Sequence, residues 1–505
     1  MATLPEEKSS SVLARYEPVI GLEVHVQLLT RSKCFCACSA AFGAPPNSNV
    51  CPVCLGLPGA LPVLNRQVVE YAVLAALALN CRINESSIFA RKNYFYPDLP
   101  KGYQISQYDK PLAEHGWIEI AAGSPANAAV AVAGVKGSNG GRKRIGITRV
   151  HIEEDAGKSM HEGSDDTSSI DLNRSGTPLI EIVSDPDLSS PEEAFEYLTK
   201  LKEIVLYTGV SDCNMEEGSL RCDANVSIRP RGQKEFGTKA EVKNVNSFRF
   251  IRQALEYEIE RQAELLDAGE KVLQETRLFN PAEGRTYGMR SKERAHDYRY
   301  FPEPDLLPLV VDEKWRDEIR RRLPELPEAR RQRMTAEYGI TEYDAGVLTA
   351  SQTLADQFEE AARAAKNPKR VANLVQTEIM GRLKAKGLAI ERSPISMKGV
   401  ALSADLAESG AISSKMLKDL YDKCFELGED FPTVYEREKP QQISDTAELE
   451  RLIDEAIRAN PKQVEQYRGG KKTVIGFFVG AVMRASKGKA NPTLVNELLA
   501  KKLEG

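Results

Sequence analysis

Several segments in the first 300 residues alternate strictly between apolar and polar side chains. In PVIGLEVHVQL, the apolar Ile20, Leu22 and Val24 alternate with the polar Glu23 and His25. Successive side chains of a β-strand point to opposite faces, so a period of two predicts strands that bury only one face. The alternation therefore predicts an antiparallel sheet with one apolar and one polar face.

The polar faces of these strands share one chemistry, because acids, imidazoles and amides alternate with cations. Every second residue of a strand lies on the same face. The polar sets defined in this way are Glu23, His25 and Gln27; Arg149, His151, Glu153 and Asp155; Arg221, Asp223 and Asn225; and Lys239, Glu241 and Lys243. Glu181 differs, since it shares its face with the apolar Leu179 and Val183. A sheet face in water needs no function. These side-chain types are nevertheless the ones that bind a hard cation and phosphate oxygens.

The segment HIEEDAGK places Glu153, Glu154 and Asp155 side by side before Lys158. Neighbouring carboxylates repel, and a magnesium–nucleotide site would supply the missing positive charge. The ending AGKS is not a P-loop, because Ile152 stands where that motif needs a glycine, and the chain has no GxGxxG motif. We expect substrate or nucleotide contacts from Arg149, Lys158, Arg221, Asp223, Asn225 and Lys243.

Four cysteines in CFCACSAAFGAPPNSNVCPVC form two close pairs, Cys36 with Cys38 and Cys51 with Cys54. Two close pairs on short turns are typical of a tetrahedral zinc site, and four thiolates would make it structural. The alternatives are idle or redox-active cysteines and an iron–sulfur cluster. Cys34 is a possible fifth competitor for the metal, and we expect it to be a bystander.

The character of the chain changes after about residue 312, from mixed strands and helices to amphipathic helices separated by Pro and Gly. The fold class we predict is α+β: an N-terminal cradle domain on an antiparallel sheet, followed by all-α helical and tail domains. The predicted bounds are 15–305, 306–395 and 396–505. Within the first domain we expect helices at 190–209 and 246–269, and a hairpin loop at 121–141.

The formal net charge is −5, so any polyanion would have to meet a local basic patch. Such a patch occurs in the tail, where cations flank an apolar helix. We expect contacts with the phosphates of a polyanion from Arg468, Lys471, Lys472, Lys487 and Lys489, with Arg484 nearby. A solvated rim around a core helix is the alternative. The apolar runs are too short to span a bilayer and the first residues do not resemble a secretory signal, so we expect a cytoplasmic protein.

Long motifs of the chain resemble the B subunit of the bacterial tRNA-dependent amidotransferases, the GatB family. They are VIGLEVHVQL, CPVCLGLPG, NYFYPDLPKGYQISQYDKP, RVHIEEDAGK, DLNRSGTPLIEIVSDPD, EEGSLRCDANVSIRP and EVKNVNSF. The similarity covers nearly the whole chain from about residue 17, and the C-terminal segment resembles the family's helical tail.

The resemblance implies an ATP- and Mg²⁺-dependent ligase that converts Glu on the glutamine tRNA, or Asp on the asparagine tRNA, into Gln or Asn. It implies Mg²⁺ ligands at Glu23, His25, Glu153 or Glu154, and Glu181. It also implies a heterotrimer whose other members are the A subunit, which is a glutaminase that supplies ammonia, and the small C subunit. Misacylated tRNA would be held by the helical and tail regions. Some members of the family have the zinc cysteines, and all four are present here.

Two other functions use the same residues. A metal-dependent phosphoesterase acting on RNA would need no glutamine donor, and a zinc-stabilised RNA-binding scaffold would need no Glu153. Amidation of misacylated tRNA in the presence of ATP and ammonia distinguishes all three.

Overall fold

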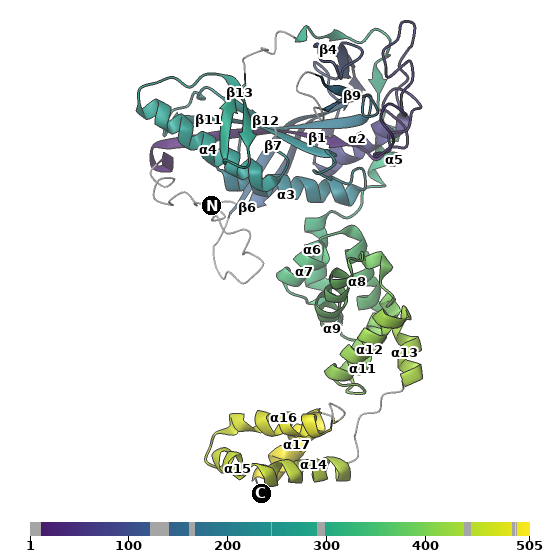
Figure 1. The fold of residues 1–505 in the computed structure, drawn as a ribbon, viewed down its shortest axis with the longest axis vertical. Helices are drawn as coiled ribbons and strands as arrows, with labels where there is room; N and C mark the ends of the chain where they lie inside the picture. Colours follow the sequence, from purple (N-terminus) through teal and green to yellow (C-terminus); the bar gives the residue numbers. More distant parts are fainter. Residues whose placement is uncertain are drawn as a thin grey trace. The chain divides into compact units, whose positions relative to one another are not determined.

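The computed structural model describes residues 12–121, 141–160, 167–243, 245–289, 298–438, 446–486, 490 and 492–504 (Figure 1). The chain forms two compact units, Met1–Leu326 and Pro327–Gly505. Nearly all of the expected hairpin loop at 121–141 lies outside the described residues.

The first unit is built on a nine-stranded sheet with the order β14-β13-β12-β11-β1-β10-β7-β6-β2. Its strands are β1 (Tyr16–Gln27), β2 (Arg82–Ile83), β6 (Ala113–Ala121), β7 (Arg142–Glu154), β10 (Pro178–Ser184), β11 (Leu220–Pro230), β12 (Ala240–Lys243), β13 (Glu275–Asn280) and β14 (Arg285–Gly288). All neighbours pair antiparallel except β12 and β13, which a helix connects and which therefore run parallel. The sheet is thus mixed, and the predicted α+β class is confirmed.

Three helices, α2 (Arg66–Ala78), α3 (Pro191–Thr208) and α4 (Phe248–Asp267), contribute to the core of this unit. The apolar residues of β1, such as Leu22 and Val24, are buried in that core. Figure 1 shows α3 and α4 running along one side of the sheet. The polar residues of the strands consequently lie on the other face, as the alternation predicts.

Helix α3 begins and ends where its sequence predicts. The Ser190 side chain accepts a hydrogen bond from the backbone N of Glu193, and Gly209 ends the helix with a left-handed φ of 68°. The spacing of Ser190 and Glu193 also predicts a capping box, and the second half of that prediction is wrong. The Glu193 carboxylate accepts from the backbone N of Ser189 rather than of Ser190, and it also pairs with Lys143.

Smaller sheets complete the first unit. They are formed by β15 (Phe301–Pro302), β4 (Ala90–Asn93) and β5 (Tyr103–Ser106); by β16 (Leu309–Val310) and β3 (Ser86–Ser87); and by β8 (Lys158–Met160) and β9 (Ser169–Asp171). The helix α5 (Glu313–Arg320) follows. Leu309, Val311 and Ile319 are buried in the N-terminal core, so this unit continues past the expected limit at residue 305.

The second unit is helical and contains two separate hydrophobic cores. One runs from Met334 to Val434 and the other from Leu449 to Leu503. The helices are α6 (Pro327–Tyr338), α7 (Glu342–Leu348), α8 (Gln352–Ala364), α9 (Pro368–Leu374), η2 (Val375–Ile379), α10 (Met380–Lys386), η3 (Ile390–Arg392), α11 (Met397–Glu408), α12 (Ser414–Leu427), α13 (Phe431–Glu438), α14 (Thr446–Ala459), α15 (Pro461–Arg468), η4 (Lys472–Val474), α16 (Ile475–Ala485) and α17 (Pro492–Glu504). Within the described ranges no helix is long and apolar enough to cross a membrane.

Candidate active site

The strand register brings residues far apart in the sequence into one row across the polar face. His25 of β1 stands opposite Arg221 of β11 on one side and opposite Glu181 of β10 on the other. Glu181 in turn stands opposite His151 of β7. Directly opposite side chains in a sheet lie close enough to interact, so the pairing assembles this row without any loop.

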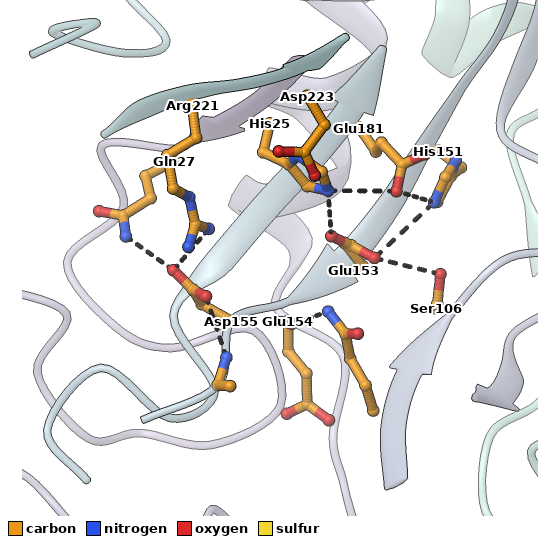
Figure 2. Close-up of polar contacts among 12 residues, drawn as sticks. His25, Gln27, Ser106, His151, Glu153, Glu154, Asp155, Glu181, Arg221 and Asp223 are labelled. Atoms are coloured by element: carbon orange, nitrogen blue, oxygen red, sulfur yellow. Dashed lines mark hydrogen bonds and ion pairs between the residues drawn. The ribbon is translucent and has the colours of Figure 1, made fainter. Parts of the chain in front are cut away.

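A compact cluster forms where Glu153 reaches toward this row (Figure 2). The Nε2 atom of His25 lies 3.4 Å from a Glu153 oxygen and 3.3 Å from a Glu181 oxygen. The Nε2 atom of His151 lies 3.8 Å and 3.5 Å from oxygens of the same two carboxylates. Two buried carboxylates thus share two imidazoles.

The cluster concentrates negative charge in a buried place. Burial acts to lower the pKa of His25, but its hydrogen bond to Glu181 and the charges of Glu181 and Glu153 outweigh that effect and raise the pKa to about 9. Burial also acts to raise the pKa of Glu181, but His151, His25 and Lys92 hold it well below its usual value. The two carboxylates therefore attract positive charge, and the raised pKa of His25 is one result.

The ligand atoms of His25, Glu153 and Glu181 all lie within 4.8 Å of one another. Neighbouring ligands of an octahedral Mg²⁺ at about 2.1 Å are about 3 Å apart, close to the nitrogen–oxygen distances in the cluster. Small side-chain movements would bring the three atoms onto one divalent ion, so these residues fit a metal.

Two of the expected metal ligands stand apart from this set. Glu23 lies two residues before His25 on β1 and accepts a hydrogen bond of 2.9 Å from Asn225. Burial raises the pKa of Glu23. Glu154 points away from the cluster, as Figure 2 shows. Its carboxylate pairs with Lys101 and accepts a hydrogen bond from the backbone N of Ile105.

Some of the residues expected to contact substrate or nucleotide border the cluster, and the others lie farther from it. Arg149 and Arg221 border the cluster: Arg149 lies 3.9 Å from Glu181, and Arg221 pairs with Asp155 at 2.9 Å. Lys243 pairs with Asp223 at 2.9 Å, farther along the sheet. Lys158 is exposed on the separate β8–β9 hairpin.

Sequence reasoning missed three residues beside the cluster. His151 was placed on the polar face but was not chosen as a candidate, although its parity matches that of Glu153. The Ser106 hydroxyl donates a hydrogen bond of 3.4 Å to Glu153. Burial acts to lower the pKa of Lys92, but Glu153, Tyr300 and Glu181 outweigh burial and raise that pKa above its usual value. Ser106 and Lys92 lie on four-residue strands, which are too short for alternation to place them.

The four cysteines predicted to bind zinc come together. Their sulfur atoms lie within 4.8 Å of one another, and those of Cys51 and Cys54 are 3.9 Å apart. Sulfur atoms around a tetrahedral zinc with bonds of about 2.3 Å are about 3.8 Å apart, so the geometry fits that metal. Cys34 is fully buried in the hydrophobic core and is not part of the group.

The tail cations lie around α15 and α16. Arg468, Lys471 and Lys472 are exposed, as is Arg484. Lys472 lies 3.2 Å from Glu504 and 4.2 Å from the centre of the Tyr467 ring. Lys487 and Lys489 lie outside the described residues.

Comparison with known proteins identifies similar chains. Residues 18–317 match the family described as the GatB/GatE catalytic domain, and residues 356–503 match the one described as the GatB domain. Three relatives are each named as the B subunit of an aspartyl/glutamyl-tRNA(Asn/Gln) amidotransferase. That of Syntrophotalea carbinolica is 56% identical over 492 residues, covering 97% of this chain and 99% of the relative. Those of Carboxydothermus hydrogenoformans and Geobacter sulfurreducens are each 54% identical, covering 97% of this chain and 99% and 100% of the relatives.

Proposed function

The chain belongs to the GatB family, and from that premise we propose that its sheet carries the ATP-dependent activation of a tRNA-bound carboxylate. The side-chain carboxylate of Glu-tRNA(Gln) or Asp-tRNA(Asn) attacks the γ-phosphorus of ATP, and ADP leaves. Ammonia then attacks the activated carbonyl carbon, and phosphate leaves to give Gln-tRNA(Gln) or Asn-tRNA(Asn). The buried cluster of His25, Glu153 and Glu181 carries this proposal.

Activation is needed because a carboxylate is a poor electrophile whose leaving group would be oxide. Phosphorylation requires one anion to approach another beside this cluster. A bound Mg²⁺ would polarise the phosphoryl oxygens and shield that approach. His25, Glu153 and Glu181 would hold the ion, with His151 beside it.

The chain's own cations would position the two anionic substrates. Arg149 and Arg221 border the cluster, so they are placed to contact a phosphate or the substrate carboxylate. Asp155 accepts hydrogen bonds from Gln27 and Arg221, each of 2.9 Å, and so orients the Arg221 guanidinium. Asp223, Asn225 and Lys243 extend the same polar face and supply further contacts.

The remaining components of the proposal are partners and a structural metal. Ammonia would come from the glutaminase, the A subunit of a heterotrimer that the small C subunit completes. The helical and tail regions would hold the tRNA. A Zn²⁺ on Cys36, Cys38, Cys51 and Cys54 would have no open coordination position, which supports a structural role.

The test is amidation of misacylated tRNA by the assembled complex, with ATP and with either glutamine or free ammonia. His25→Ala, Glu153→Gln and Glu181→Gln should abolish ATP-dependent amidation with both nitrogen donors, while tRNA binding survives. Glu17→Gln is the matched control, because Glu17 lies on the same face of β1 and pairs with Arg229 instead.

Near wild-type amidation by the cluster variants would disprove the proposed site. Hydrolysis of RNA without a nitrogen donor would favour a phosphoesterase, although membership of the family does not favour that reaction. Binding of tRNA with no turnover in the complete complex would favour a scaffold.

A further inference from the structure

One lysine of the first unit is buried completely. The Lys33 side chain is 0% exposed and is among the largest fully buried side chains in the described residues. It lies between the cysteine loop and the turn that follows β9. Its Nζ atom lies 2.7 Å from the carbonyl oxygen of Asn49, 3.5 Å from that of Leu172 and 3.6 Å from the sulfur of Cys54.

An ammonium group in such a place needs a negative partner. Transfer of an unpaired charge from water into a protein interior is strongly unfavourable, and two carbonyl groups supply dipoles but no charge. Among the ion pairs of the described ranges, Lys33 has none with a carboxylate, and the nearby Glu154 pairs with Lys101. The sulfur of Cys54 is therefore the group that can supply the missing charge, provided that it is a thiolate.

We propose that Lys33 is the built-in counter-cation of the four-cysteine site and so favours its loaded, fully ionised form. The inference rests on the proposed zinc site. A zinc ion with four thiolates carries a net charge of −2, which is costly to bury. Lys33 halves that charge and donates a hydrogen bond to one ligand sulfur, as second-shell groups do in other metal sites.

Lys33 also connects the cysteine site to the start of β10. Gly176 lies next to both residues, since an added Cβ would be in ordinary van der Waals contact with Lys33 Cδ at 3.4 Å and with Cys54 Cβ at 3.5 Å. The backbone N of Gly176 donates to the carbonyl of Asp155, and its carbonyl accepts from the backbone N of Cys34. Loss of the lysine would loosen the metal loop at the point where it meets the strands that carry Glu153 and Glu181.

The test compares wild type, Lys33→Met and Lys33→Arg in the assembled complex, with Lys110→Met as a control at an exposed position. Zinc content is measured first, and then the rate of zinc transfer to a chromogenic chelator. Lys33→Met should release zinc faster by about tenfold, the usual scale for loss of an outer-shell partner. Lys33→Arg should restore part of the wild-type rate, and Lys110→Met should match wild type.

A second measurement separates this role from a general loss of packing. Replacement of all four cysteines by serine removes the thiolates, so the Lys33 ammonium loses its anion. In that background Lys33→Met should raise the thermal midpoint, whereas it should lower the midpoint of the zinc-loaded protein. In Co²⁺-substituted protein it should also shift the sulfur-to-cobalt charge-transfer bands.

The outcomes are distinguishable. Wild-type protein without bound zinc would overturn the proposed zinc site. Zinc-loaded protein in which Lys33→Met releases the metal at the wild-type rate, or lowers the thermal midpoint equally in both backgrounds, would overturn the role of Lys33 and leave the zinc site standing.

Discussion

Glu153 and Glu154 are neighbours in the chain, but β7 sends their side chains to opposite faces. Glu153 enters the cluster with His25 and Glu181, whereas Glu154 is buried against Lys101. The side chains of Lys101 and Glu154 are only 7% and 3% exposed, so each depends on the other for its charge. Two chemically identical residues should therefore respond to the same substitution in different ways.

Glu153→Gln should weaken Mn²⁺ binding to the complex, followed by electron paramagnetic resonance, by about tenfold or more, since it removes a charged ligand. Glu154→Gln should keep the wild-type affinity but destabilise the first unit by about 3 kcal/mol, because Lys101 stays buried without its partner. Calorimetric unfolding of the same samples measures the second effect. Equal loss of metal affinity in both variants would contradict this division.

Strand parity alone favours Glu153 over Glu154, because it groups Glu153 with His151 and Asp155. The resemblance left that choice open. Lys33 and Lys92 could not be predicted in the same way, since their importance comes from contacts made by turns and short strands. A lysine in a loop is normally exposed, and nothing in the local sequence marks Lys33 as buried.

At the scale of elements, a carboxylate on α2 holds α5 and the segment after it. Glu70 accepts hydrogen bonds from Arg66 of its own helix at 3.0 Å, from the Trp315 indole at 3.4 Å and from Arg322 at 2.7 Å. Arg66 also lies over the Trp315 ring. This contact explains why the N-terminal unit extends beyond the predicted limit at residue 305, because Pro and Gly mark turns but do not reveal how a later helix docks.

Glu70→Gln should destabilise the docking of α5 by about 1 kcal/mol. The loss is small because the arginine partners of Glu70 are largely exposed. Burial acts to raise the pKa of Glu70, but Arg322, Arg66 and Trp315 outweigh it and lower the pKa below 4.5. The stabilisation is therefore present above pH 4.5 and lost as the pH falls through the lowered pKa. Hydrogen exchange of the α5 amides should show protection reduced about fivefold at neutral pH, and the difference from wild type should shrink in acid.

Glu318→Gln, on the exposed side of α5, is the control for that experiment. It should leave the protection of α5 unchanged at every pH. A Glu70→Gln variant whose difference from wild type stays constant from neutral pH down to acid would show that the carboxylate charge does not hold the helix.

At the scale of the whole molecule, three hydrophobic cores follow one another along the chain. The predicted limit at 395 and 396 falls inside the second core, which includes Leu383 on one side and Val400 on the other. The third core begins only at Leu449. Amphipathic helices of similar length look alike in sequence, so their periodicity predicts that each is buried on one side but not which helices share a core.

Deletion of residues 439–505 removes the third core and leaves the second intact, whereas a cut after residue 395 would divide the second. The shorter deletion should raise the KM for aminoacyl-tRNA by about tenfold, equivalent to about 1.4 kcal/mol of binding free energy. Any tRNA-independent glutaminase activity of the assembled complex should stay unchanged. An unaltered KM would show that the tail does not contribute to tRNA binding.

The exposed cations of the tail test the same idea without removing any core. Arg468, Lys471 and Lys472 are exposed, so alanine at all three positions should leave the third core folded. Removal of each phosphate contact should make the slope of log affinity against log salt less negative by about 0.7 to 0.9, or by about 2.1 to 2.7 for all three. The matched control replaces Arg451, Arg458 and Lys462, which are also exposed cations of the third core. If both triple variants bind tRNA with the wild-type salt slope, the cations are only a solvated rim. If both variants make the salt slope less negative by the same amount, binding follows the net charge of the tail rather than a patch near α16.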